Sequence, residues 1–364
     1  RTVENKLQES VSVKDFGAVG DGVTDDTSAL ISCFASLSEG DSVYIPAGIY
    51  GYIAVAADIP RGVTIYGDGE GSVLKYIGTS NPASAHTLIT TSNNDITFMN
   101  FKMDCNTSIF NTGSYDSGTG VYTGSYNGNV YGMIFNGSNN ISFDSVVFEN
   151  FNASGVLSNG SSANANSYND NWRITNCTAN NNRVSSFDLQ GMRNLVVSGC
   201  IFRNSGLKEA TYIDGGTGYG IILGRIVTSG RSMSKGIVVT NCILEGNVRH
   251  GVDSHSAIDF TISDCFFKDN VIFGVAHINA ITSPNDAYYG SIAITGCSFQ
   301  NENVTQAMYA KLDKIDGGAT LRTEGGPIFI TSSDYVKLAT VSNNSVDDYN
   351  FMVDRDYTSE DIIS

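Results

Sequence analysis

The sequence predicts an all-β solenoid of short strands, and the main observation behind this prediction is a repeated phrase. Five cysteines occupy the same point of phrases such as R-I-T-N-C-T-A-N and V-V-T-N-C-I-L-E, namely Cys177, Cys200, Cys242, Cys265 and Cys297. Cys177 and Cys200 are 23 residues apart, and so are Cys242 and Cys265. Alternating apolar and polar residues at a period in the twenties indicate stacked strands that each contact only their neighbours.

Composition supports the same fold class. The 364 residues include 39 Gly and only 5 Pro, and Asn, Ser and Thr are abundant, which suits many short strands closed by tight polar turns. The sequence has no run of 18 apolar residues, so we expect no insertion into a membrane. No secretory signal is visible, and Arg1 in place of Met indicates a fragment or a processed chain.

The cysteines are predicted to be reduced core residues. Stacked strands would place the five repeated thiols in a ladder about 4.8 Å apart. Such a ladder does not provide the converging tetrahedron that zinc requires, so we expect neither a metal site nor disulfides, and no cofactor.

Charge argues against some partners. The net charge of −16 disfavours nucleic acid or an anionic membrane as a partner. Residues 170–255 nevertheless hold nine positive against six negative side chains, Arg225 and Arg249 among them. This cluster is either scatter on solvated turns or a locally cationic face for an anionic ligand.

The first 70 residues carry a specific resemblance. The segment V-S-V-K-D-F-G-A-V-G-D-G-V-T-D-D-T-S-A-L is followed by V-Y-I-P-A-G-I-Y and V-T-I-Y-G-D-G. Together they resemble the first turns of the pectate-lyase-like, single-stranded right-handed parallel β-helix of bacteriophage tailspikes. The resemblance implies a homotrimer in the virion tail that binds a bacterial surface polysaccharide as host receptor. It also implies contacts with other phage tail proteins through a part preceding residue 1, and synthesis in the host cytoplasm. Asp21, Asp25 and Asp26 would then be turn and cap residues.

The chain divides into four expected segments. Residues 1–14 are a neck or linker, and 15–70 begin the β-helix with a short capping helix. Ala29, Leu30, Cys33, Phe34 and Leu37 share one face of that helix, whose N-cap is Asp25, Asp26 or Thr27. Residues 71–335 form the coils with inserted loops, and 336–364 form a last coil or a trimer contact.

Counting eleven residues on from each phrase position identifies a candidate site. The count reaches Leu157, Asp188, Asp253 and Ala276, and pattern matching adds Ile222 to the same column. Strand alternation predicts that this column points outward on an external face. Two positions further along the strands, Gln190 and His255 point outward as well.

Two carboxylates in this column predict glycoside hydrolysis. Asp188 and Asp253 lie two coils apart, so their backbones should be about 9.6 Å apart. Carboxylates separated by roughly 6.5–9.5 Å leave room for the water of an inverting glycosidase, with one acting as general acid and the other as general base. Glu209 and Asp214, on the predicted 204–218 loop, are reserve candidates. Equally, aspartates beside turns are common, and two in one column can arise by chance.

The segment N247-V-R-H-G-V-D-S-H255 leaves a lyase open. Arg249 and His250 stand close to Asp253 and His255, in an order similar to motifs of alginate epimerases and lyases. The resemblance implies that His255 exchanges a sugar C5 proton while Arg249 neutralises the uronate carboxylate. His250 is a substrate-binding candidate or a satisfied turn histidine, and His277 should point into the core.

Aromatic side chains are further candidates for binding. Tyr212 and Tyr219, with Gln190 and Arg225, could contact sugar, or the tyrosines could pack loops onto the helix. A non-catalytic glycan-binding adhesin and a purely structural spike remain alternatives to the enzyme.

Overall fold

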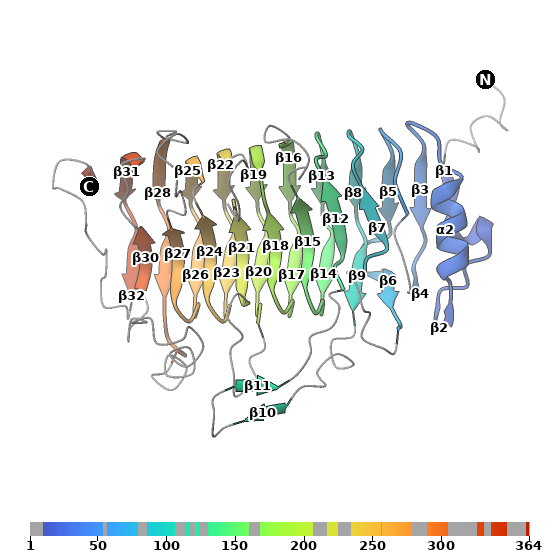
Figure 1. Cartoon of the computed structure of the whole chain (residues 1–364), viewed down its shortest axis with the longest axis horizontal. Helices are drawn as coiled ribbons and strands as arrows, with labels where there is room; N and C mark the ends of the chain where they lie inside the picture. Colours follow the sequence, from blue (N-terminus) through green and yellow to red (C-terminus); the bar gives the residue numbers. More distant parts are fainter. Residues whose placement is uncertain are drawn as a thin grey trace.

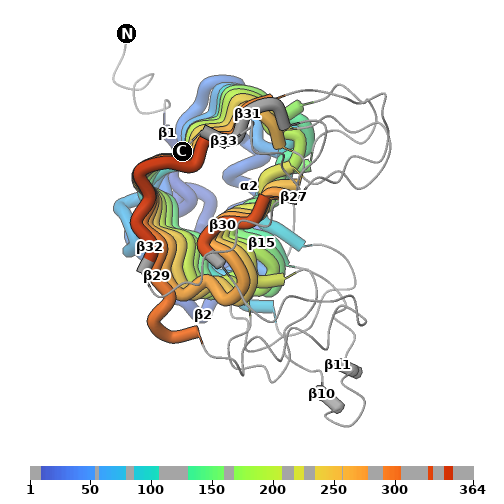
Figure 2. The backbone as a smooth tube through the Cα atoms, turned by 90° about the vertical axis from the view of Figure 1, so that its left-hand side faces the viewer, coloured from blue at the N-terminus to red at the C-terminus, as the bar shows by residue number. Residues whose placement is uncertain are grey.

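The computed structural model of the chain is a parallel β-helix, in which three parallel sheets run side by side along one axis (Figure 1). Seen along that axis, successive coils lie over one another (Figure 2). The structure describes residues 10–53, 57–78, 86–105, 114–116, 121–123, 130–159, 168–206, 217–224, 234–255, 257–278, 290–304, 326–330, 336–347 and 362–363. The predicted all-β solenoid is confirmed.

Each full coil contributes one strand to each of three sheets, which we call sheets A, B and C. The strands of sheet A are β1 (Ser10–Ser12), β3 (Ser42–Ile45), β5 (Thr64–Gly67), β8 (Thr97–Met99), β13 (Ser142–Asp144), β16 (Asn169–Thr175), β19 (Met192–Ser198), β22 (Lys235–Thr240), β25 (Ile258–Ser263), β28 (Gly290–Thr295), β31 (Val336–Ser342) and β33 (Ile362–Ile363). The strands of sheet B are β2 (Asp21–Asp25), β4 (Gly48–Tyr52), β6 (Ser72–Tyr76), β9 (Lys102–Cys105), β14 (Val147–Glu149), β17 (Thr178–Asn180), β20 (Ile201–Arg203), β23 (Ile243–Glu245), β26 (Phe266–Lys268), β29 (Ser298–Gln300) and β32 (Ser345–Asp347). The strands of sheet C are β7 (Ile89–Thr91), β12 (Met133–Asn136), β15 (Ser154–Asn159), β18 (Ser185–Leu189), β21 (Tyr219–Leu223), β24 (His250–His255), β27 (Phe273–Ile278) and β30 (Gly326–Ile330).

The remaining described elements are short. An antiparallel pair, β10 (Ser114–Asp116) and β11 (Val121–Thr123), stands apart from the three sheets. The helices are η1 (Val13–Phe16), α2 (Thr27–Ala35) and η2 (Gly69–Gly71). None of the helices in the described part of the chain is long and apolar enough to cross a membrane.

A left-handed residue makes the turn from sheet A to sheet B in coil after coil. The residues at this turn are Asn176, Gly199, Asn241, Asp264, Gly296 and Asn343, with φ between 53° and 66°. Glycine, asparagine and aspartate tolerate this region far better than other residues. The residue before the cysteine in each phrase is therefore dictated by the backbone of the turn.

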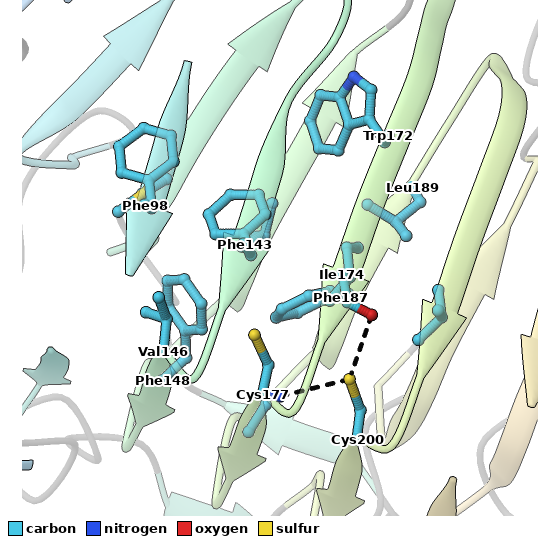
Figure 3. Close-up of a cluster of buried hydrophobic side chains, with 14 of the residues drawn as sticks. Phe98, Phe143, Val146, Phe148, Trp172, Ile174, Cys177, Phe187, Leu189 and Cys200 are labelled. Atoms are coloured by element: carbon cyan, nitrogen blue, oxygen red, sulfur yellow. Dashed lines mark hydrogen bonds between the residues drawn. The ribbon is translucent and has the colours of Figure 1, made fainter. Parts of the chain in front are cut away.

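The cysteines follow these turns and form the predicted column. All seven cysteines of the described chain are free and buried. In Figure 3 the thiol of Cys200 lies beside Cys177, whose backbone N–H donates to Cys200 Sγ at 3.4 Å. Phe143, Phe148 and Phe187 pack over this pair in the core. Burial raises the pKa of Cys33, in helix α2, to about 12, so that thiol stays protonated.

Buried asparagines complete the corners of the coils, a feature that the repeated phrase did not predict. Asn182 accepts from the backbone N–H of Phe151 at 3.0 Å and donates to the Phe148 carbonyl at 3.2 Å. Asn247 and Asn270 occupy the same corner in later coils. Asn247 donates to Asn270 Oδ1 and to the Phe202 carbonyl, and Asn270 donates to the Leu244 carbonyl. Each side chain satisfies backbone groups that the turn leaves unpaired.

Helix α2 covers one end of the stack, beside β1 and β3 (Figure 1). Leu30, Cys33 and Phe34 are its buried residues. Asp26 precedes the helix, but its carboxylate accepts from the N–H groups of Val19 and Gly20 instead of capping the helix. Asp21 accepts from the N–H groups of Val23 and Thr24, and Asp25 accepts from that of Thr27. The predicted turn role of the three aspartates is confirmed, whereas Asp26 stands at the N-cap position without a capping hydrogen bond.

Candidate functional site

The predicted column of sheet C is present with the predicted register. Asp188 pairs with Ile222 of the next coil, and Ile222 pairs with Asp253. Leu157 and Ala276 extend the column on either side. Asp188 and Asp253 therefore lie two strands apart, about 9.6 Å between backbones at the usual strand spacing.

The column faces away from the core, as predicted. It is buried, however, and does not form the predicted external face. Phe187, Ile221 and Val252, which alternate with it, belong to the hydrophobic core, whereas buried Ile222 does not. Asp188 and Asp253 are nevertheless only 7% and 2% exposed. The expectation of a solvated face was wrong because strand alternation predicts which way a side chain points and not what covers it.

A glycine near the start of the strand changes the alternation and brings His250 to the same side as Asp253. A Cβ on Gly251 would lie 2.7 Å from the Gly274 carbonyl oxygen and 2.8 Å from the ring of Phe267. Gly251 and the following Val252 thus both face inward, which only a residue without a side chain permits. His250, one residue earlier, is left on the outer side.

Asp253 and His255 form the best-defined polar pair of the site. His255 Nε2 lies 2.9 Å from Asp253 Oδ2. The His255 side chain is 29% exposed, whereas that of Asp253 is 3% exposed. Asp253 Oδ1 is buried and has no hydrogen-bond partner in the described chain. The carboxylate therefore orients an imidazole that reaches solvent, and it keeps one oxygen unused.

Asp188 has a parallel arrangement two strands away. The Gln190 side-chain amide donates to Asp188 Oδ1 at 3.1 Å, and both residues are buried. Between the two pairs, β21 carries Ile222 opposite both aspartates, and Gly224 follows the end of the strand, so neither position contributes a polar side chain. The structure thus brings Asp188, Gln190, Asp253 and His255 onto one face, as predicted.

His250 is part of a strand and not of a turn. Its ring lies between Tyr219 of the preceding coil, at 5.6 Å, and Phe273 of the following coil, at 5.4 Å and nearly parallel. Burial lowers the pKa of His250 to about 4, and the nearby Arg249 also lowers it, so the imidazole is neutral. His250 Nδ1 has no hydrogen-bond partner among the described residues, so the interpretation as a satisfied turn histidine was wrong.

The other candidates fall into two groups. Arg249 lies over the Tyr219 ring, 5.5 Å from its centroid, and Tyr219 is buried, so its ring packs on the protein itself. Glu209, Asp214, Tyr212 and Arg225 lie outside the described residues.

The described arginines do not gather on one cationic face. Arg173 and Arg193 are on sheet A, and Arg203 is on sheet B. Arg183 is buried, and its Nε donates to the Asn152 carbonyl at 2.6 Å. Within the described ranges, the local excess of positive charge is therefore distributed around the helix.

His277 lies in the core, as predicted. It is 2% exposed, its Nδ1 lies 3.1 Å from Ser254 Oγ, and its ring contacts Phe260. No group of three or more His, Cys, Asp or Glu side chains that could hold a metal occurs in the described segments.

One feature of the site was missed in the sequence. Tyr219, His250 and Phe273 form a column of rings on the outer side of sheet C. Aligning the strands Y-G-I-I, H-G-V-D and F-G-V-A would have shown it, since each has a ring followed by glycine.

Parts of the sequence are similar to curated phage tail proteins. A segment of 81 residues is 42% identical to the tail spike protein of Shigella phage Sf6 and covers 21% of this chain and 13% of that protein. A segment of 122 residues is 33% identical to the pre-neck appendage protein of Bacillus phage B103, covering 32% and 14%. The matches thus span about one seventh of the length of these curated relatives.

Solved structures share the fold at low sequence identity. The surface adhesin PfbA of Streptococcus pneumoniae superimposes with a TM-score of 0.62 and 15% identity, covering 93% of this chain and 78% of that one. Gene product 12 of bacteriophage phi29 gives 0.58 and 15%, covering 94% and 46%, and the Dettilon tailspike gives 0.55 and 14%, covering 95% and 63%. A family model described as rhamnogalacturonase A/epimerase, pectate lyase-like, matches residues 10–298, which is more than half of the sequence, and the chain belongs to this family.

Proposed function

We propose that the chain is the β-helical body of a phage tailspike-type protein that binds and cleaves a bacterial surface polysaccharide on the outer side of sheet C. The observation that carries this proposal is the pair formed by Asp253 and His255. It joins a buried carboxylate to an imidazole that solvent can reach. Such a pair is suited to general acid–base chemistry near neutral pH. The similarity to phage tail spike and pre-neck appendage proteins supports the biological setting.

Glycoside hydrolysis is the first candidate reaction. The register places Asp188 and Asp253 on the same side of sheet C with one strand between them. That spacing leaves room for a water molecule between a general acid and a general base. His255 then relays or donates the proton, because it is the member of the group that is exposed.

Elimination from a uronate-containing glycan is the second candidate, and a different observation favours it. Arg249 directly precedes β24, the strand that ends with His255, and its charge acts on the His250 imidazole next to it. In this reaction His255 removes the C5 proton, Asp253 orients it, and Arg249 stabilises the sugar carboxylate.

One experiment tests the function and separates the reactions. The purified protein is incubated in ¹⁸O-water with a panel of acidic capsular polysaccharides and O-antigens, and the products are weighed by mass spectrometry. Fragments that carry one ¹⁸O indicate hydrolysis, and unlabelled unsaturated fragments indicate elimination. If the protein binds a glycan of the panel and releases no fragment from it, the enzyme proposal is wrong and a glycan-binding adhesin remains.

The assembly follows from the same proposal. A tailspike-type protein would be a homotrimer in the virion, attached to other phage tail proteins and acting at the host cell surface. Light scattering on the purified chain would give three times the monomer mass of 38.8 kDa if the trimer forms without the rest of the tail. A monomer under conditions where cleavage is retained would argue against a site shared between subunits.

A further inference from the structure

His250 lies among aromatic side chains, where an apolar ring would be expected. The ring packs at a tilt against Tyr219 and stacks on Phe273, and Phe273 stacks in turn on Phe329 at 4.9 Å. Phenylalanine would fill the same place in this column. Imidazole adds a polar atom, Nδ1, that is buried and has no hydrogen-bond partner within the described chain.

This polar atom makes the position unfavourable for stability. A buried donor or acceptor without a partner lowers stability, because it gives up its hydrogen bonds to water. The ring stacking of His250 does not require that atom. Unsatisfied polar groups of this kind are rare in folded proteins and need a reason other than packing.

A second unsatisfied atom lies on the same strand and the same side. Asp253 Oδ1 is buried without a partner, while its other oxygen binds His255. His250 and Asp253 both belong to β24, three residues apart, and the charge on Asp253 acts on the His250 imidazole. One group can accept a hydrogen bond, and the other can donate or accept one, which is the complement of a sugar hydroxyl.

We propose that His250 is a specificity-determining residue, whose Nδ1 acts together with Asp253 Oδ1 to hydrogen-bond hydroxyl groups of one sugar unit of the bound glycan. This inference rests on the proposed function of the same site. It adds that the unit bound there is a hydroxylated sugar, recognised through a neutral imidazole and a carboxylate. A unit without the hydroxyl would leave both protein atoms unpaired and would be rejected.

The substitution His250→Phe isolates the polar atom, because the new ring can keep the stacking with Tyr219 and Phe273. We expect the variant to be at least as resistant to urea as the wild type. For the glycan that the wild type cleaves, we expect KM to rise roughly 10- to 100-fold, as for the loss of one buried hydrogen bond, with kcat changed much less. His250→Tyr serves as a second variant of the same design.

His277→Gln is the matched control, since His277 is also buried but binds Ser254 inside the core. It should lower the urea midpoint and leave KM unchanged. If His250→Phe cleaves with the wild-type KM, the inference is overturned while the proposed function stands. Failure of both His250 variants to fold would show that the imidazole is structural and would also overturn the inference. If the wild type binds no glycan of the panel, the proposed function fails and this inference fails with it.

Discussion

Asp253 and His277 illustrate two ways in which sheet C holds a polar side chain away from water. His277 is paired with Ser254 in the core, whereas Asp253 keeps one oxygen paired with His255 and the other unpaired. Satisfied polar groups can stabilise a unique packing, whereas each unsatisfied one costs free energy and calls for an explanation of its own. Burial alone therefore does not separate structural from functional residues in this strand.

Replacing Asp253 by Asn should remove cleavage and keep binding. The amide is isosteric with the carboxylate but cannot orient and stabilise a charged His255, so we expect kcat to fall about 100- to 10,000-fold. Glycan affinity, measured by calorimetry, should change by less than an order of magnitude. Asp259→Asn is the control, because Asp259 pairs with Lys235 on sheet A, away from the site. Unchanged kcat in Asp253→Asn would move the catalytic group elsewhere.

The two buried histidines predict a loss of stability in mild acid. Burial lowers the pKa of His250 and of His277 to about 4, whereas an unfolded chain titrates near 6.5. Both are neutral above pH 6.5, so their contribution is complete there. As the pH falls from 6.5 towards 4, the unfolded state binds protons that the folded state does not. Each histidine should therefore cost about 2 kcal/mol between pH 7 and pH 5.

Urea unfolding at pH 7 and pH 5 measures this effect. The midpoint should drop at pH 5 in the wild type and drop less in His250→Phe, which has lost one of the two groups. An equal drop in both proteins would show that His250 is not neutral and buried in solution.

At the scale of the element, the repeated phrase predicted the strands and their register better than it predicted their surroundings. The period of the cysteines placed Asp188 and Asp253 in one column correctly. Both aspartates lie eleven residues after a cysteine of the repeat, and equal spacing along the coil gives equal positions in the stack. The period could not show that Gly251 turns inward, since that depends on the ring of Phe267 one layer away. It also could not show how deeply the column is buried, because the alternation along a strand carries no information on what lies over its outer side.

The turns between sheets A and B can test whether the left-handed backbone conformation explains the residue found there. Asn241 has φ of 53°, and its side chain is exposed to solvent. Asn241→Ala should destabilise the protein by about 1–2 kcal/mol, since Ala is strained in this region, and Asn241→Gly should be close to neutral. Thermal unfolding of the two variants decides the point. Equal losses in both would mean that the asparagine side chain, and not the left-handed backbone, matters here.

At the scale of the whole molecule, the stack has an end that must be closed. Helix α2 covers the first coil with Leu30 and Phe34, both of which are buried. An uncovered terminal coil would present unpaired strand edges and core side chains to other molecules. The apolar face shared by Leu30, Cys33 and Phe34 predicted this cap, and the helix lies where it was expected.

Opening that end should promote self-association. The double substitution Leu30→Ala and Phe34→Ala removes the buried contacts of the cap at a cost of several kcal/mol, on the order of 2–5 per residue. We expect concentration-dependent aggregates in light scattering, with the far coils still folded by circular dichroism. Ile31→Ala on the same helix is the control, because Ile31 is 37% exposed. If the double variant stays as dispersed as the control, the helix is not what protects the end.

The cysteine column also allows local unfolding to be measured separately for each coil. Because five coils each hold one buried thiol at the same place, a thiol reagent can modify a given cysteine only when that coil has separated. Brief labelling followed by peptide mapping would then show, coil by coil, from which end the helix unravels.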